Sequence, residues 1–316
     1  MSQRRVWWGV VVVVLALVGC KRSEDKGGSG ARGTGGAAAV GGAGVMLAEG
    51  AAEDLRVTDD GRFATYLVRA RKPLVEGVPP QMRLGELHLV PVEGGVPRRL
   101  GDGVTNVPGG LLFSPGSRHV LFLTGFNVAN HSGALHVLEL GEPTAEPRKV
   151  GEAVSYFVPS PDGKSVAFVD GGVLKLGPLP TGPFRQVGGE VSTAGFSPDS
   201  GTLFFKRRLT AAGGLLAVPV QEPAGKTSEP RKLAEQVGDY VLSPDSKHVA
   251  YQTRTSAALG TYDLYVADLP ALEGRKVATG TTSFAFSPDS KWLARNDGGK
   301  PEQAGDVVVE IGRAHV

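Results

Sequence analysis

Short runs in which apolar and polar residues alternate recur along the chain from about residue 50 onward. Typical first runs cover residues 120–123, 166–169 and 249–252, and each is followed by a second run, such as 134–140. A third run then opens with basic residues, as at 148–150. A period of two is typical of strands, and no helical periodicity accompanies it. With Gly or Pro at the joints, the pattern predicts repeated antiparallel sheets of four strands.

One recurring phrase, Ser-Pro-Asp followed by Gly or Ser, stands just before the first alternating run in four units, and variants of it, Thr58-Asp59-Asp60-Gly61 and Ser114-Pro115-Gly116-Ser117, stand in the first two. Proline presets a turn dihedral, and Asp, Ser and Gly suit the other positions of a tight turn. The period of a four-stranded propeller blade is roughly 40–45 residues. The phrases therefore predict an all-β fold, a six-bladed β-propeller of four-stranded antiparallel blades over residues 45–310. Their Ser or Thr anchors stand at positions 58, 114, 160, 197, 243 and 287.

These phrases resemble the Ser-Pro-Asp-Gly-Lys signature of TolB-like, WD-repeat-like bacterial propellers, and the resemblance covers nearly all of the chain after residue 50. The copy at 160–164 matches it in full, whereas the first copy reads Thr58-Asp59-Asp60-Gly61. The Gly-His and Trp-Asp dipeptides of true WD repeats are missing. The resemblance implies a propeller that serves as a scaffold in the bacterial envelope.

The front of the chain has the form of an export signal. Arg4 and Arg5 precede an apolar run, 6–18, which is shorter than the roughly 20 residues of a membrane-spanning helix. The run ends in Leu17-Val18-Gly19-Cys20, which resembles the lipobox of bacterial lipoproteins, where the cysteine is acylated. We expect residues 1–19 to be a lipoprotein signal peptide and Cys20 to be lipidated. An uncleaved anchor or an ordinary signal peptide is the alternative.

Cys20 is the only cysteine, so a disulfide, a thiolate metal site and a cysteine nucleophile are excluded elsewhere. After it the composition changes to Gly, Ala and Ser, which cannot bury enough apolar surface to fold. Residues 20–44 are therefore expected to be a lipidated cysteine and a flexible tether, with the bilayer as partner. Lys21 favours an outer-membrane address, on the periplasmic or surface-facing side.

Charge and motifs exclude several classes of function. The 34 basic and 32 acidic residues leave a net charge of +2, which gives no support for nucleic-acid binding. The sequence contains no motif of a serine hydrolase, zinc peptidase, phosphate loop or dinucleotide site. The recurring turn Asp residues stand on separate blades, so we expect no catalytic residues, metal or cofactor. Basic pairs that open the fourth strands are interpreted as protection of exposed sheet edges.

One face of the predicted propeller gathers charged residues, because the second-to-third loops and the fourth-to-next loops share it. We expect an acidic ring near the channel mouth and basic loops outside it, suited to a charged peptide, a glycan or a cation. Ordinary solvated charges are the alternative. The acidic residues are Asp102, Glu152, Glu190 and Glu235, and the basic ones are Arg69, Arg71, Lys72, Arg207, Arg208 and Arg254.

The last residues, 311–316, break the repeat. Their sequence, Ile-Gly-Arg-Ala-His-Val, is what a common short-read sequencing adapter encodes in one frame, so we expect adapter read-through. The last blade would then be incomplete at the C-terminus, and its fourth strand would come from a missing tail or from residues 45–47.

Two functions stay open on this basis. The favoured one is a membrane-tethered envelope lipoprotein whose propeller binds a protein, a peptide or an envelope polymer without catalysis. The alternative is the N-terminal propeller of an exported serine peptidase resembling the prolyl oligopeptidases, with its hydrolase domain beyond the sequence.

Overall fold

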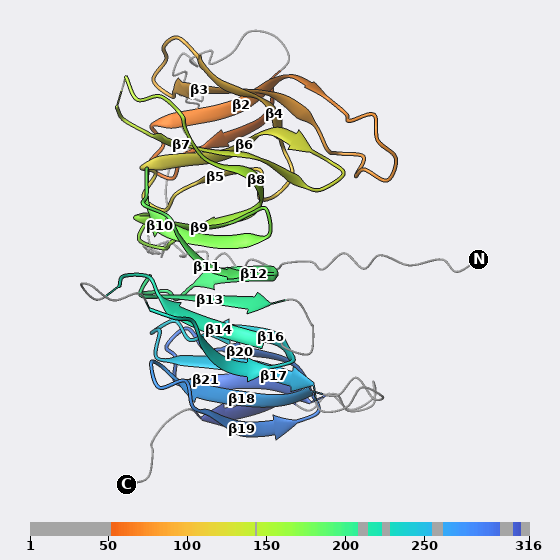
Figure 1. Cartoon of the computed structure of the whole chain (residues 1–316), viewed down its shortest axis with the longest axis vertical. Helices are drawn as coiled ribbons and strands as arrows, with labels where there is room; N and C mark the ends of the chain where they lie inside the picture. Colours follow the sequence, from red (N-terminus) through yellow and green to blue (C-terminus); the bar gives the residue numbers. More distant parts are fainter. Residues whose placement is uncertain are drawn as a thin grey trace, which may run out of the picture. The chain divides into compact units, whose positions relative to one another are not determined.

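The computed structural model describes residues 52–142, 144–207, 214–222, 228–254 and 262–297, together with the backbone of 306–310. Within these ranges every regular element is a β-strand and none is an α-helix (Figure 1). All strand pairs are antiparallel, and neighbours in each sheet are consecutive along the chain. The predicted all-β class is therefore confirmed, and the predicted four-stranded antiparallel sheet occurs in three of the five sheets.

The first sheet is a simple meander of four strands. These are β1 (Ala52–Val57), β2 (Phe63–Arg71), β3 (Leu84–Pro91) and β4 (Arg98–Thr105).

The next sheet has seven strands because one long strand belongs to two repeats. The first part of β8 pairs with β7 and its second part, from Val154 to Pro159, pairs with β9. The second and third units are thus hydrogen-bonded into a single sheet, which the sequence pattern did not predict. Its strands are β5 (Leu111–Phe113), β6 (His119–Asn127), β7 (Ser132–Glu139), β8 (Arg148–Pro159), β9 (Ser165–Asp170), β10 (Val173–Pro178) and β11 (Arg185–Gly189).

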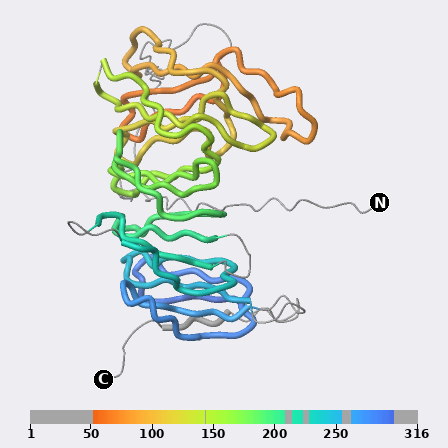
Figure 2. The backbone as a smooth tube through the Cα atoms, in the orientation of Figure 1, coloured from red at the N-terminus to blue at the C-terminus, as the bar shows by residue number. Residues whose placement is uncertain are grey.

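Three further sheets follow, and the backbone keeps the same up-and-down order in each (Figure 2). In the last of them three strands are described, and residues 45–47, one expected source of a fourth strand, lie outside the described residues, as do residues 311–316. The strands are β12 (Val191–Phe196), β13 (Thr202–Arg207), β14 (Gly214–Pro219) and β15 (Arg231–Glu235); β16 (Val237–Leu242), β17 (His248–Arg254), β18 (Tyr262–Asp268) and β19 (Gly274–Thr279); and β20 (Thr281–Phe286), β21 (Trp292–Asp297) and β22 (Asp306–Glu310).

Each recurring phrase forms the same turn between the first and second strand of its unit. In the third copy the Ser160 amide donates to the Ser165 carbonyl, and the Ser165 amide donates to the Ser160 hydroxyl, both at 2.9 Å. The Ser160 hydroxyl donates to Asp162 Oδ1 at 2.5 Å, and that oxygen also accepts the Lys164 amide at 3.1 Å. The Ser and Asp side chains thus satisfy the polar backbone of the turn, as the phrase predicts.

The fourth residue of the phrase links one turn to the next. Ser200 has a φ of 62°, and its hydroxyl accepts the amide of Asp162, in the preceding turn, at 3.0 Å. A hydrogen bond of this type is worth about 0.5–1.5 kcal/mol. The same bond joins three other pairs of consecutive turns: Asp60 to Ser117 (3.4 Å), Asp199 to Ser246 (2.9 Å) and Asp245 to Ser290 (3.0 Å).

One described junction between turns lacks this serine. Gly163 stands in its place with a φ of 68°, and a side chain there would clash with the Pro115 carbonyl oxygen of the preceding turn. The two backbones therefore approach closely where the other junctions have a hydroxyl.

Alternation along the second strands places the core between consecutive sheets. In β13, Leu203 and Phe205 are fully buried against the preceding sheet. Phe204, between them, is fully buried against Val249 and Tyr251 of the following sheet. Both faces of an inner sheet are thus covered, which is why its second strand is almost continuously apolar.

We expect the turn carboxylates to make the fold sensitive to acid. The Thr58 hydroxyl and the Arg62 side chain lower the pKa of Asp60 to about 2. Burial alone would raise the pKa of Asp199, but hydrogen bonds from the Ser197 hydroxyl and the Gly201 amide lower it overall. A lowered folded pKa stabilises the fold above the unfolded value, about 3.9, and this contribution is lost as the pH falls through the folded value. The thermal unfolding temperature should therefore decrease as the pH is lowered from about 4 to about 2.

The variant Asp199→Asn isolates this effect. It should lower the unfolding midpoint at pH 6, and the difference from the wild type should shrink toward pH 2, where the wild-type carboxyl is protonated. Asp59→Asn, at an exposed carboxylate with no hydrogen-bond partner among the described residues, is the matched control. An equal loss at both pH values would contradict the assignment.

Candidate functional site

Each antiparallel sheet has two ends with different connections. The Ser-Pro-Asp turns and the third-to-fourth connections lie at what we call the turn end. The second-to-third connections and the passages to the next unit lie at the opposite end, the loop end. By this topology the predicted charged residues that are described lie at the loop end of their sheets. Arg208 and Cys20 lie outside the described residues.

A β-bulge in the fourth strand positions the acidic residues. In β4 the register passes from Arg99, opposite His88, to Gly101, opposite Leu87, so that Leu100 is the extra residue. An extra residue reverses the alternation of side chains, so residues three apart then point to the same side. The same bulge recurs in four more fourth strands, at Val150, Val187, Leu233 and Val277.

Three of the four predicted acidic residues pair across this bulge with a cation three residues earlier. Asp102 pairs with Arg99. The other two pairs, Lys149–Glu152 and Lys232–Glu235, have N–O distances of 2.6 Å each. Such exposed pairs contribute at most about 1 kcal/mol, but they neutralise the carboxylates locally. Glu190, in a left-handed conformation with a φ of 56°, has no side-chain partner among the described residues.

The predicted basic residues divide into bound and unbound groups. Arg69 pairs with Glu86 at 2.8 Å. Arg207 is half-buried beside Gly188 of the preceding sheet, with its Nε buried. In contrast, Arg71, Lys72 and Arg254 are exposed, and no described residue pairs with their side chains. Of the predicted and described residues at the loop end, those without a side-chain partner are therefore these three cations and Glu190.

Sequence reasoning missed an exposed apolar segment beside two of these cations. Leu74 is 103 % exposed and Val75 is 50 % exposed in the connection from β2 to β3. The base of this connection is fixed by Asn106, whose Oδ1 accepts the Arg83 amide at 2.7 Å and whose Nδ2 donates to the Gln81 carbonyl at 3.0 Å. The signal was present, since two apolar residues follow the basic pair in a long loop.

Arginines at the start of the fourth strands bind the following unit at the turn end. Arg231 donates to the carbonyls of Pro270 and Ala271 at 2.9 and 2.8 Å. Arg98 pairs with Glu146 at 2.9 Å. Arg185 donates to the Pro219 carbonyl and pairs with Glu222 at 3.0 Å. We call these residues clamp arginines, and their contacts go beyond the edge protection inferred from the sequence.

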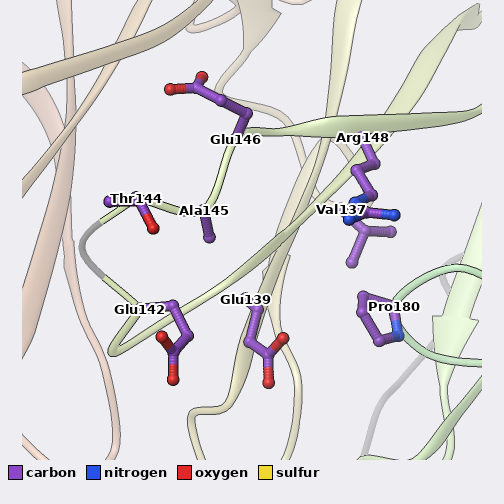
Figure 3. Close-up of a pocket in the computed structure, with 8 residues that line it drawn as sticks. All are labelled: Val137, Glu139, Glu142, Thr144, Ala145, Glu146, Arg148 and Pro180. Atoms are coloured by element: carbon purple, nitrogen blue, oxygen red, sulfur yellow. The ribbon is translucent and has the colours of Figure 1, made fainter.

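Arg148, the first residue of β8, stands at the equivalent place in its strand. A pocket of about 430 Å³ lies beside it at the turn end (Figure 3). Val137 and Pro180 contribute apolar surface, while Glu139 and Glu142 contribute carboxylates. No group of three or more His, Cys, Asp or Glu side chains suited to a metal ion occurs in the described part of the chain. Nor does any helix within those ranges have the length and apolar character to cross a membrane.

No protein-family pattern and no curated protein sequence matches this chain. Solved structures share its fold at low identity. A eukaryotic initiation factor structure is 14% identical over 81% of this chain and 75% of that chain, with a TM-score of 0.50. TolB from Acinetobacter baumannii is 16% identical over 80% and 62%, with a TM-score of 0.38. Oligogalacturonate lyase in complex with manganese is 12% identical over 81% and 80%, with a TM-score of 0.44.

The likeness to the initiation factor is one of fold, and the two weaker likenesses carry no argument about function. The local chemistry of the chain must therefore support any proposal.

We expect the clamp arginines to stabilise the contact between units. Arg231→Ala removes two charge-assisted hydrogen bonds to backbone carbonyls, and it should lower the free energy of unfolding by about 1–3 kcal/mol. Arg148→Ala is the matched control, because Arg148 has no partner among the described residues and its loss should change stability by less than about 0.5 kcal/mol. Denaturant unfolding measures both values. Equal losses in the two variants would refute the clamp.

Proposed function

We propose that this protein is a lipoprotein of the bacterial envelope, tethered through acylated Cys20, whose sheets close into a six-bladed propeller. The propeller acts as a non-catalytic scaffold that binds a protein or an envelope polymer at its loop end. The observation that carries the proposal is the exposed Leu74 beside the unpaired Arg71 and Lys72, a surface suited to an acidic partner.

Closure of the propeller is supported by two unpartnered faces at the ends of the series. Trp292, the first residue of β21, is 42 % exposed on the face that would meet a following sheet. Its counterpart in the first unit, Phe63, packs against the second unit. At the other end of the series, Leu55 and Val57 of β1 are 62 % and 50 % exposed.

The counterparts of Leu55 show what such a residue does elsewhere in the chain. Leu111 and Ala194 hold the same place in their first strands, and both are buried in the cluster shared with the preceding sheet. Among the described residues, no sheet precedes that of Leu55. We therefore assign the last sheet to that place, with Trp292 against Leu55 and Val57.

A non-catalytic role is supported by the state of the recurring carboxylates. Each turn Asp accepts a hydroxyl and an amide of its own turn, as Asp245 does from Ser243 at 2.6 Å and from Lys247 at 3.1 Å. Burial raises the pKa of Asp245, but these hydrogen bonds lower it overall. A lowered pKa suits a structural carboxylate and not a general acid.

The emission of Trp292 tests closure. In a chain with Trp7→Phe and Trp8→Phe, it is the only tryptophan. We expect emission that is blue-shifted from that of free tryptophan and protected from iodide, and Leu55→Asp should remove both properties. Leu74→Asp is the matched control, because Leu74 is also an exposed leucine but lies at the loop end. Iodide quenching equal to that of free tryptophan, unaffected by Leu55→Asp, would contradict closure.

We expect one variant to lose the membrane anchor and another to lose the binding partner. Cys20→Ser should abolish incorporation of labelled palmitate and release the protein from the membrane fraction. Chemical cross-linking in cells should still join this variant to the binding partner. The double variant Arg71→Glu, Lys72→Glu should stay in the membrane fraction but lose most of the cross-linked partner, because the charge is reversed against an acidic surface.

The double variant Lys164→Glu, Lys247→Glu makes the same change in charge at the turn end and should keep the partner. Palmitate labelling that survives Cys20→Ser would exclude the anchor. Equal loss of the partner in both charge variants would exclude the loop end as its binding surface.

A further inference from the structure

A second site, at the turn end, emerges from comparing the three clamp arginines with Arg148. Arg98, Arg185 and Arg231 each bind the third-to-fourth connection of the following unit. Their acceptors are a carboxylate, a carboxylate with a carbonyl, and two carbonyls respectively. Arg148 stands at the same place in its strand, yet it has no partner among the described residues.

The following unit explains why Arg148 is left without a partner. Its third-to-fourth connection, residues 179–184, contains no acidic residue. Phe184 packs edge-on against Phe168, with ring centroids 5.1 Å apart. The connection therefore does not present a carboxylate or a carbonyl to Arg148, and Pro180 faces the pocket instead.

The space beside Arg148 has the character of a small-ligand pocket. Its volume, about 430 Å³, lies within the usual range of such sites. Val137 is buried and apolar, whereas the side chains of Glu139 and Glu142 are exposed and form no hydrogen bond or ion pair with a described residue. The Glu139 carboxylate has His119 opposite it in the neighbouring strand. Glu146 is engaged by Arg98, so the remaining charges are one guanidinium and two carboxylates. Figure 3 shows the two carboxylates on the side of the pocket that lies across from Glu146.

We propose that this pocket binds a short extended peptide that carries a cationic side chain. Arg148 donates hydrogen bonds to a carboxylate or a backbone carbonyl of the peptide, as the clamp arginines do to segments of this chain. Glu139 and Glu142 take the ammonium group, and Val137 and Pro180 contact the apolar part. The site is separate from the loop end, so it stands or falls independently of the proposed function.

Calorimetric titration of the full-length chain in detergent tests the site, with acetyl-Ala-Lys-Ala bearing a free carboxylate as the probe. We expect saturable binding that Arg148→Ala weakens about tenfold, the effect of losing one charge-assisted hydrogen bond. Arg118→Ala, at an exposed arginine in the turn of the same unit, should bind as the wild type does. Absence of binding up to about 10 mM probe, the millimolar limit of weak recognition, overturns the proposal.

A second pair of measurements distinguishes the ammonium contact from general charge. Glu142→Gln should weaken binding of acetyl-Ala-Lys-Ala severalfold and leave that of acetyl-Ala-norleucine-Ala unchanged. Equal weakening of both probes, or equal binding of acetyl-Ala-Lys-Ala by wild type and Arg148→Ala, overturns the assignment. Circular dichroism verifies that each variant is folded.

Discussion

The hydrogen bond from an Asp amide in one turn to a Ser hydroxyl in the next holds consecutive sheets in a fixed relation. Because Ser200 and its counterparts have a left-handed backbone, their hydroxyls point toward the preceding unit and not into their own turn. The apolar faces of neighbouring sheets can then interdigitate with a constant register, as Phe204 and Phe205 do on opposite sides of β13. The clamp arginines add a second link farther from the turns, so three of the interfaces are fixed at two points.

This double linkage leaves the loop end of the sheets free for binding. Most charges there are either neutralised across a bulge, as in Lys149–Glu152, or packed against a neighbour, as is Arg207. What remains without a described partner is a small set of charged groups, among them Arg71 and Lys72 beside the exposed Leu74. A rigid framework that presents a few unneutralised groups is typical of a binding scaffold, since little conformational entropy is lost when a partner binds.

The features that sequence reasoning predicted well are local ones. The turn at Ser160 and Asp162 depends on residues within five positions of each other, so its geometry can be inferred from the phrase alone. The bulge at Leu100 was missed, although the recurring order of basic, apolar, small and acidic residues around it was available as a signal. The contacts of Arg231 could not be inferred, because they depend on where the next unit places the carbonyls of Pro270 and Ala271. The lack of a described partner for Arg148 likewise depends on which groups the next unit, where Phe184 packs against Phe168, places beside it.

The long strand β8 has a consequence for the way the chain comes apart. Elsewhere consecutive units meet through side chains and single hydrogen bonds, whereas the second and third units are also joined by one continuous strand, which pairs with β7 up to Val154 and with β9 from Val154 onward. Moving one of these units away from the other would bend β8 at Val154, the residue that pairs on both sides. The amide protons around Val154 should therefore exchange more slowly than those at the other passages between units. The repeat is regular in sequence, but one of its junctions is continuous in backbone pairing.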